Sequence, residues 1–217
     1  MIPTVSAATP DPRLPAPAGM LILAADTSLP ILSVALVLDD ALIGAVALEG
    51  KLSRNEKLLP AIDWLLSEAA IERSAIDLFA VTRGPGSFTG VRIGLATMQG
   101  LALALGKPVC AMSTHEAIAP EAGRMAIIDD AGRGEFYVSV FEGGREVIGP
   151  HLATRDEVDA IENTTRVADV AQRGNVALSC ARRARAIALR GDGDRYHDVT
   201  PIYVRLAEAE VKLQQKR

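Results

Sequence analysis

The sequence has few cysteines, histidines and aromatic residues, and each scarcity excludes a class of protein. Its 217 residues include two cysteines, Cys110 and Cys180, which lie far apart. Neither a disulfide framework nor a clustered zinc site is therefore encoded, and we interpret both as reduced thiols of a cytoplasmic protein. The histidines at 115, 151 and 197 form no i, i+4 pair, so the paired-histidine metal site of a helical zinc peptidase is not encoded.

Long apolar runs and an excess of one charge are also missing. Charge or glycine interrupts each apolar stretch before the roughly 20 residues that span a bilayer, so we expect no transmembrane helix and no membrane partner. The formal net charge is −4, which gives no global attraction to nucleic acid. A basic cluster lies in a run without acidic residues: Arg182, Arg183, Arg185 and Arg190. A solvated helix face is the ordinary interpretation of this cluster, and a contact with tRNA is left open.

Apolar periodicity predicts an α/β protein. The segments 21–25, 31–38 and 41–49 are rich in β-branched residues and are separated by turn signals, which favours an antiparallel meander. Helical spacing follows over 53–70, and the regular helix is expected to begin near Glu56–Lys57, so that Pro60 lies in its first turn. Further strands and helices are predicted at 76–82, 90–105, 107–112, 125–130, 135–142, 145–153, from 155, and at 176–190. The proline-rich residues 1–19 lack the pattern of a signal peptide, and we expect a disordered extension there.

The glycine-rich segment 83–95, RGPGSFTGVRIGL, lies between a predicted strand and a predicted helix. A P-loop is excluded because no lysine occurs in the segment or in the helix after it. The glycines Gly84, Gly86 and Gly90 are spaced one residue too far apart for a dinucleotide fingerprint. Ser87 lacks the flanking glycines of a hydrolase nucleophile elbow. None of the three phosphate-binding or nucleophile motifs fits.

What remains is a tight turn at a helix N-terminus, and two interpretations stay open. Helix N-terminal amides bind anions, and arginines flank the turn. Alternatively the glycines only shape the backbone, and a hydroxyl caps the helix. The residues of this interface or anion-binding loop are Arg83, Gly84, Gly86, Ser87, Thr89, Gly90, Arg92 and Gly94.

The helix after the loop has a side with little side-chain bulk. Glycines at 90, 94 and 100 and alanines at 96, 102 and 104 form this side, although each interior glycine costs about 1 kcal/mol of helix propensity. Such a surface lets another element approach closely, either a sheet of the same chain or another protein subunit.

Asp26, Thr27 and Ser28 follow the first predicted strand. A carboxylate and two hydroxyls at a strand end could meet a phosphate or a metal. They could equally close a turn through side-chain hydrogen bonds. No nucleophile–base pair can be assigned from the sequence.

Taken together, these segments resemble one known family. LILAADTS, NEKLLPAIDWLL, TRGPGSFTGVRIGLATMQGLALAL, STHEAIA, IIDDAGRGEFYVSVF and PIYVRLAE are similar to the TsaB (YeaZ) proteins of tRNA threonylcarbamoyladenosine biosynthesis. The resemblance extends from about residue 20 to about 206. It implies an actin-like, Hsp70-like ATPase (ASKHA) fold with two lobes, each a mixed sheet flanked by helices. We assign 20–112 to the first lobe, 113–200 to the second, and 201–217 to a strand piece and helix that return to the first lobe.

The resemblance also implies a function. TsaB proteins lack the paired metal-binding histidines of their M22 peptidase-like paralogue TsaD, and here His115 is followed by Ala119 at i+4. We therefore expect a non-catalytic partner of TsaD, which acts with TsaE on tRNA at the adenosine after the anticodon. The expected contacts are the helices at 56–70, with Leu58, Leu59, Ile62 and Leu66, and at 90–105.

Four further expectations concern cofactors and assembly. No cofactor or metal would be bound tightly by this chain alone, ATP or ADP would bind at the interface of the complex, and tRNA would be contacted indirectly. The isolated chain would form a homodimer.

The alternative function is a stand-alone nucleotide phosphohydrolase or residual M22-type peptidase, with Asp26 and Thr27 at the phosphate.

Overall fold

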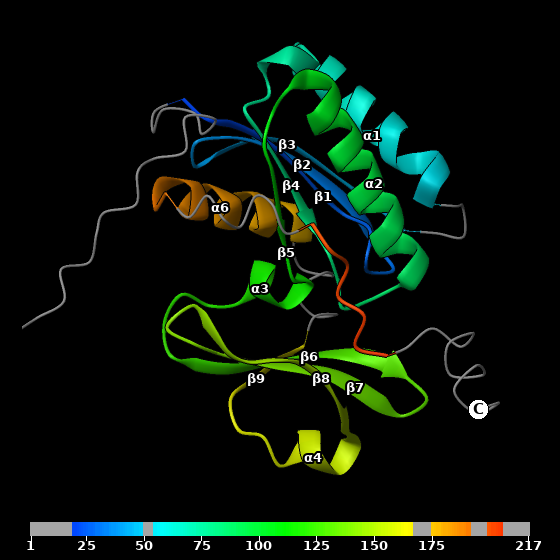
Figure 1. The fold of residues 1–217 in the computed structure, drawn as a ribbon, viewed down its shortest axis with the longest axis vertical. Helices are drawn as coiled ribbons and strands as arrows, with labels where there is room; N and C mark the ends of the chain where they lie inside the picture. The colour runs from blue at the N-terminus through cyan, green and yellow to red at the C-terminus, as the bar shows by residue number, and fades with distance from the viewer. Residues whose placement is uncertain (1–18, 50–53, 167–174, 192–198, 206–217) are drawn as a thin grey trace, which may run out of the picture.

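The computed structural model describes residues 19–49, 54–166, 175–191 and 199–205. They form two β-sheets, one above the other in Figure 1, with helices around them. Nearly all of the predicted N-terminal extension and the polar helix expected at the C-terminus lie outside the described residues.

The first sheet has five strands in the order β3-β2-β1-β4-β5. Their bounds are β1 Leu21–Asp26, β2 Leu32–Leu38, β3 Ala41–Leu48, β4 Leu78–Thr82 and β5 Val109–Met112. Strands β1 to β3 form the predicted antiparallel meander. Strands β4 and β5 run parallel to β1, so the loop that follows β4 lies at the same sheet edge as the residues that follow β1.

Helices cover both faces of this sheet. On one face lie α1 (Arg54–Glu68) and α2 (Phe88–Leu105), with the short η1 (Arg73–Ala75) joining α1 to β4. On the other lie α6 (Val176–Leu189) and the short α3 (Thr114–Ile118). Because successive strand side chains point to opposite faces, Leu23 packs under α1 and α2 whereas Ile22 packs against α6.

Helix α6 belongs to the first sheet, although it falls within the range 113–200 that the sequence analysis assigned to the second lobe. Asn175 holds the start of α6 against β2 and β3, because its side-chain amide donates to Val34 O at 3.2 Å and Val46 O at 3.0 Å. Ala177 N donates to Ser33 Oγ at 3.1 Å. The chain therefore returns to the first lobe before the C-terminal segment where a return was expected.

The second sheet has the order β8-β7-β6-β9. Its strands are β6 Arg124–Gly132, β7 Glu135–Glu142, β8 Arg145–Thr154 and β9 Thr164–Arg166, and one face carries α4 (Arg155–Asp159). Thr154 and Glu157 form a capping box at the start of α4, as the sequence predicts for a cap at that threonine.

Helix α1 begins earlier than predicted. It starts at Arg54, so Pro60 lies inside the helix rather than in its first turn. Pro60 is exposed, and the missing amide hydrogen bond therefore faces water rather than the core.

A strap of residues 199–205 connects the two lobes. Ile202 N donates to Arg83 O at 2.8 Å, and the Tyr203 ring lies 4.7 Å from the ring of Phe88 at the start of α2. Arg92 Nε donates to Tyr203 Oη at 2.7 Å. At the other end, Arg205 Nη1 donates to Ala131 O at 3.1 Å, near the end of β6. The strap is the red segment of Figure 1.

Candidate functional site: the glycine loop and a two-helix face

The glycine loop turns sharply after β4 because two of its residues have backbone conformations that favour glycine. Gly84 has φ +96° and Gly86 has φ +149°, in the region that side chains disfavour. A Cβ on Gly84 would lie 2.8 Å from Ile202 O, and one on Gly86 would lie 2.5 Å from Ser28 O. The turn is therefore shaped by close contacts with the strap and with the end of β1.

The glycines at the start of α2 are used within the chain. A Cβ on Gly90 would overlap Thr27 O, and a Cβ on Gly94 would overlap Thr27 Oγ1. Of the two partners left open by the sequence, the chain's own sheet is the one that approaches Gly90 and Gly94. Gly100 differs, since a Cβ there would have no atom within 4 Å.

Ser87 caps α2, because its Oγ accepts the hydrogen bond of Gly90 N at 3.2 Å. Ser87 N also donates to Ser28 O at 2.7 Å. The serine is thereby held in a structural role, and the loop presents no activated nucleophile. Thr89, the other candidate cap, is exposed on the outer side of the helix.

Asp26, Thr27 and Ser28 form a buried turn. All three are at most 2% exposed. Asp26 Oδ1 accepts hydrogen bonds from Ser28 N at 3.2 Å, from Ser28 Oγ at 2.6 Å, and from Thr82 Oγ1. Thr27 Oγ1 donates to Gly90 O at 2.7 Å. These contacts occupy Asp26 Oδ1 and the hydroxyls of Thr27 and Ser28, which favours the turn interpretation over a phosphate or metal site.

Burial shifts the pKa of three groups near the junction of the lobes. Desolvation raises the pKa of Asp26, although its hydrogen bonds from Ser28 and Thr82 act in the opposite direction. Burial raises the pKa of Asp129 to about 6. The His115 ring, 0% exposed, lies with Nδ1 2.8 Å from Ser139 Oγ, and burial lowers its pKa to about 3.

No group of three or more potential metal-ligating side chains occurs among the described residues. Ala119, four residues after His115, has no ligand atom.

The two arginines that flank the loop lie in different surroundings. Arg83 Nη1 donates to Thr200 O at 3.2 Å, so this side chain holds the strap. The Arg92 guanidinium lies 3.8 Å from the centre of the Phe88 ring while it bonds Tyr203. Both arginines therefore tie the loop and the start of α2 to the C-terminal strap.

Helices α1 and α2 lie side by side (Figure 1). Four large apolar side chains are exposed there: Leu59 by 44%, Trp64 by 56%, Phe88 by 37% and Leu103 by 85%. We call these four residues the two-helix face.

This face corrects part of the predicted interface. Leu58, Ile62 and Leu66 are 1%, 0% and 4% exposed and belong to the core beneath α1, so they do not face a partner. Leu59 alone of the four predicted residues of α1 is exposed. The sequence analysis missed Trp64 and Leu103, because α1 carries apolar residues on both sides and α2 is apolar nearly throughout. Trp64 is the single tryptophan of the sequence, and its position on a predicted helix was the available indication of an exposed contact.

Helix α2 has an outward stripe with little bulk. Ala96, Gly100 and Ala104 are exposed, and Arg92 is the single charged residue of the helix. A shallow cavity of about 340 Å³ opens on this side between Phe88 and Thr97. By length and a mean hydropathy of 1.3, α2 also meets the requirements of a membrane span, which the sequence analysis did not expect, but it packs one side on β1 and β4. Its other side offers an apolar, closely approachable surface.

Comparisons with known proteins agree on one family. The family model described as "TsaD: tRNA N6-adenosine threonylcarbamoyltransferase" matches residues 51–191. The TsaB protein of Bacillus subtilis is 29% identical over 89% of this chain and 97% of its own length. The Escherichia coli TsaB is 36% identical over 57% of this chain and 55% of its own. The YeaZ structure from Pseudomonas aeruginosa has a TM-score of 0.65 at 26% identity, covering 85% of this chain and 99% of that one.

Proposed function

Because this chain belongs to the family described as tRNA N6-adenosine threonylcarbamoyltransferase, as one of its TsaB (YeaZ) proteins, we propose that it is a non-catalytic partner subunit. It would be required by TsaD for threonylcarbamoyladenosine modification of tRNA at the adenosine after the anticodon. The chain then contributes a binding surface and a scaffold rather than reacting groups.

The two-helix face is the observation that carries this proposal. Leu59, Trp64, Phe88 and Leu103 are exposed apolar side chains on two adjacent helices. Aromatic anchors of this kind are typical of the centres of protein interfaces. The small stripe at Ala96 and Gly100 lets a facing helix approach α2 closely. The occupant is proposed to be the corresponding pair of helices of TsaD.

The histidine position is consistent with a partner that does no metal chemistry. His115 is fully buried against Ser139, and Ala119 replaces the second ligand of a helical pair. The stand-alone hydrolase alternative would need Asp26 and Thr27 at a phosphate, and both are buried in a turn.

The finer assembly is also part of the proposal. TsaE would join TsaD and this chain in a larger cytoplasmic complex, in which ATP or ADP binds at the subunit interface. In the absence of TsaD the same two-helix face would pair with a second copy of this chain. Light scattering of the isolated chain at micromolar concentration should then give a dimer.

The test uses the full chain and the TsaD of the same organism. Trp64→Glu and Leu103→Glu each place a charge on the exposed face without touching the core. Loss of a central interface residue costs about 2 kcal/mol or more, so each variant should bind TsaD at least about 30-fold more weakly. Binding is measured by titration calorimetry, and the modified nucleoside is measured by mass spectrometry of digested tRNA.

Val147→Glu is the matched control. Val147 is 48% exposed on β8, in the other lobe, so the same charge should leave TsaD binding unchanged. If Trp64→Glu and Leu103→Glu bind TsaD as the control does, the face is not the contact. If tRNA is fully modified without this chain, the partner role itself is refuted.

A further inference from the structure

A cavity of about 900 Å³ lies between the lobes, away from the two-helix face. Its walls come from α6, α3, the turn between β7 and β8, Arg83 of the glycine loop and Ile202 of the strap. Helices α1 and α2 cover the opposite face of the first sheet, and the strap that passes the cavity reaches the start of α2 through Tyr203. In Figure 1, α3 lies between α6 and the second sheet.

Arg183 is the central residue of this cavity. It is 8% exposed, yet it lines the cavity wall. Nη2 donates to Gly144 O at 2.6 Å, its one hydrogen bond in the described part of the chain. Gly144 has φ +75°, and a Cβ there would lie 3.4 Å from Arg183 Nη1. The glycine turn thus makes room for the guanidinium.

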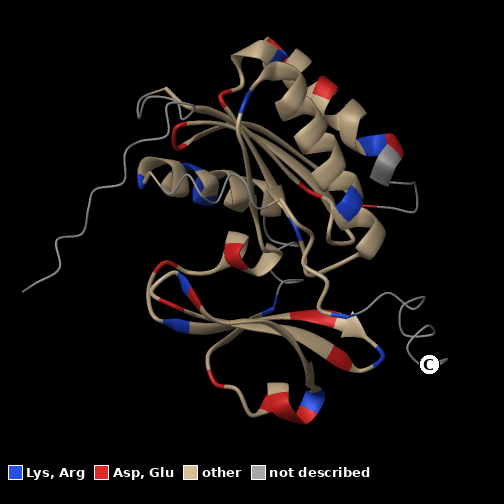
Figure 2. Cartoon of the chain, in the orientation of Figure 1, with Lys and Arg blue, Asp and Glu red and all other residues tan. Residues whose placement is uncertain are grey.

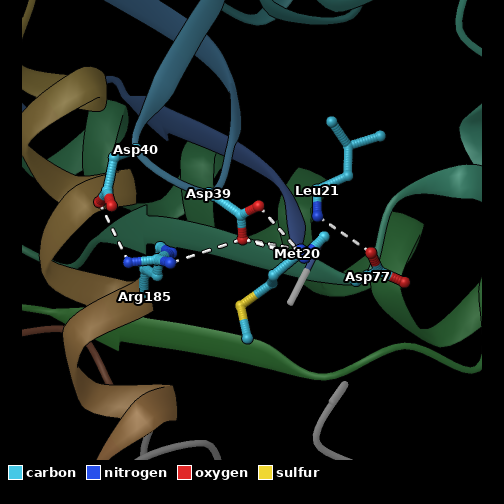
Figure 3. A network of polar contacts seen from close by, with 7 residues as sticks. Met20, Leu21, Asp39, Asp40, Asp77 and Arg185 are labelled. Carbon is cyan, nitrogen blue, oxygen red and sulfur yellow. Dashed lines mark hydrogen bonds and ion pairs between the residues drawn. The ribbon is translucent and has the colours of Figure 1, made fainter. Parts of the chain in front are cut away.

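The charge of Arg183 is not neutralised by the residues that the structure describes. Arg185, two residues further along α6, differs in this respect: it pairs with Asp39 at 3.5 Å and Asp40 at 3.1 Å, as Figure 3 shows. A guanidinium has five N–H donors, and a buried charge without a counter-ion is costly. An anion in the cavity would supply that counter-ion.

Two more arginines line the same cavity. Arg190 follows Arg183 by seven residues, two helical turns, and so lies on the same side of α6. Arg145 begins β8. Neither has an ion-pair partner among the described residues. Figure 2 shows the basic positions along α6.

Acidic side chains also line the cavity, and their negative charge restricts the kinds of ligand that could bind there. Glu116 and Glu146 take part in polar contacts of their own, and Glu121 lies beside the turn. Carboxylates repel a bare anion but accept hydrogen bonds from hydroxyl and amino groups. A ligand that carries a phosphate together with hydroxyl or amino groups can pair with the arginines through its phosphate and with the glutamates through those groups.

We propose that this cavity binds a nucleotide, with Arg183, Arg190 and Arg145 holding its phosphate. Arginine suits phosphate because its planar fork makes two parallel hydrogen bonds. The ribose hydroxyls and base amino groups supply the donors that the glutamates accept, and 900 Å³ lies within the range of small-molecule pockets. The nucleotide is either free or part of an RNA chain, since the phosphate chemistry is shared.

The experiment compares AMP and an unmodified tRNA transcript as probes of the full chain. Titration calorimetry measures AMP binding, and fluorescence anisotropy measures labelled tRNA. Arg183→Gln should weaken the bound probe at least about tenfold, because a charge-assisted hydrogen bond to a buried group is lost. Arg190→Gln and Arg145→Gln, at exposed positions that do not endanger folding, should each weaken it about threefold or more.

Arg182→Gln is the matched control, because Arg182 is exposed on the same helix and does not line the cavity. It should bind both probes within about twofold of the wild type. AMP binding sensitive to Arg183 identifies a free nucleotide, and sensitivity of tRNA binding alone identifies RNA. The proposal is overturned if neither probe binds saturably, or if Arg183→Gln and Arg190→Gln bind as Arg182→Gln does. TsaD binding should be unaffected in all these variants, so this test can fail while the partner role stands.

Discussion

Gly90 and Gly100 lie in the same helix, and the same substitution should have opposite effects at the two positions. Replacing glycine by alanine inside an exposed helix stabilises a protein by about 0.5–1 kcal/mol. At Gly100 nothing lies within 4 Å of the added Cβ. Gly100→Ala should therefore raise the free energy of unfolding by that amount.

At Gly90 the added Cβ would overlap Thr27 O, a backbone atom at the end of β1. Neither the helix nor the strand end can yield cheaply, and overpacking of this kind costs about 1–3 kcal/mol. After the gain in helix propensity is subtracted, Gly90→Ala should lower the free energy of unfolding by about 1–2 kcal/mol.

A second pair of variants separates backbone from side-chain overlap. The Cβ of Gly94→Ala would meet Thr27 Oγ1, which Thr27→Ala removes. Thr27→Ala should therefore relieve the cost of Gly94→Ala and leave the cost of Gly90→Ala in place. Urea unfolding followed by circular dichroism measures all of these values. Equal stabilisation by Gly90→Ala and Gly100→Ala would refute the account of the glycine loop given above.

Two further predictions concern α1 and the second lobe. Leu58→Ala should lower the free energy of unfolding in urea by about 2–4 kcal/mol with little direct effect on TsaD binding. Leu59→Ala should leave the free energy of unfolding within about 0.5 kcal/mol of the wild type and weaken TsaD binding. The same result for both variants would contradict the assignment of the two faces. Because the folded pKa of Asp129 is raised to about 6, its contribution to stability is present below about pH 4 and is lost as the pH rises to about 6. At pH 7.5, Asp129→Asn should therefore unfold at a higher urea concentration than the wild type, with a free energy of unfolding greater by up to about 3 kcal/mol. This difference in stability should disappear at pH 4.

Much of the local structure of this protein can be predicted from residues that are close together in the sequence. The antiparallel meander, the capped α2 and the capping box at Thr154 each depend on residues a few positions apart. For this reason β-branched runs, turn residues and caps predict them well. The family resemblance, carried by the segment RGPGSFTGVRIG and its companions, is confirmed by the comparisons.

Long-range packing accounts for what the sequence did not reveal. The side of α1 that faces the core depends on the sheet beneath it, and apolar residues at both Leu58 and Leu59 give no local basis for a choice. The return of α6 to the first sheet depends on Asn175 bonding Val34 and Val46, more than 120 residues away. Arg183 stood in a basic cluster, and helical periodicity alone separates it from Arg185, but its burial depends on the distant glycine turn that packs on it.

The strap joins the start of α2 to the end of β6, in the other lobe. Its tyrosine rests on the first turn of α2, and its last arginine donates to Ala131 O in β6. A rotation of the second lobe must either break one of these contacts or shift the helix that bears half of the two-helix face. Under the proposed partner role, lobe orientation and affinity for the partner would be linked reciprocally. Whatever holds the lobes at one angle would change the affinity for the partner, and a bound partner would restrict that angle in turn.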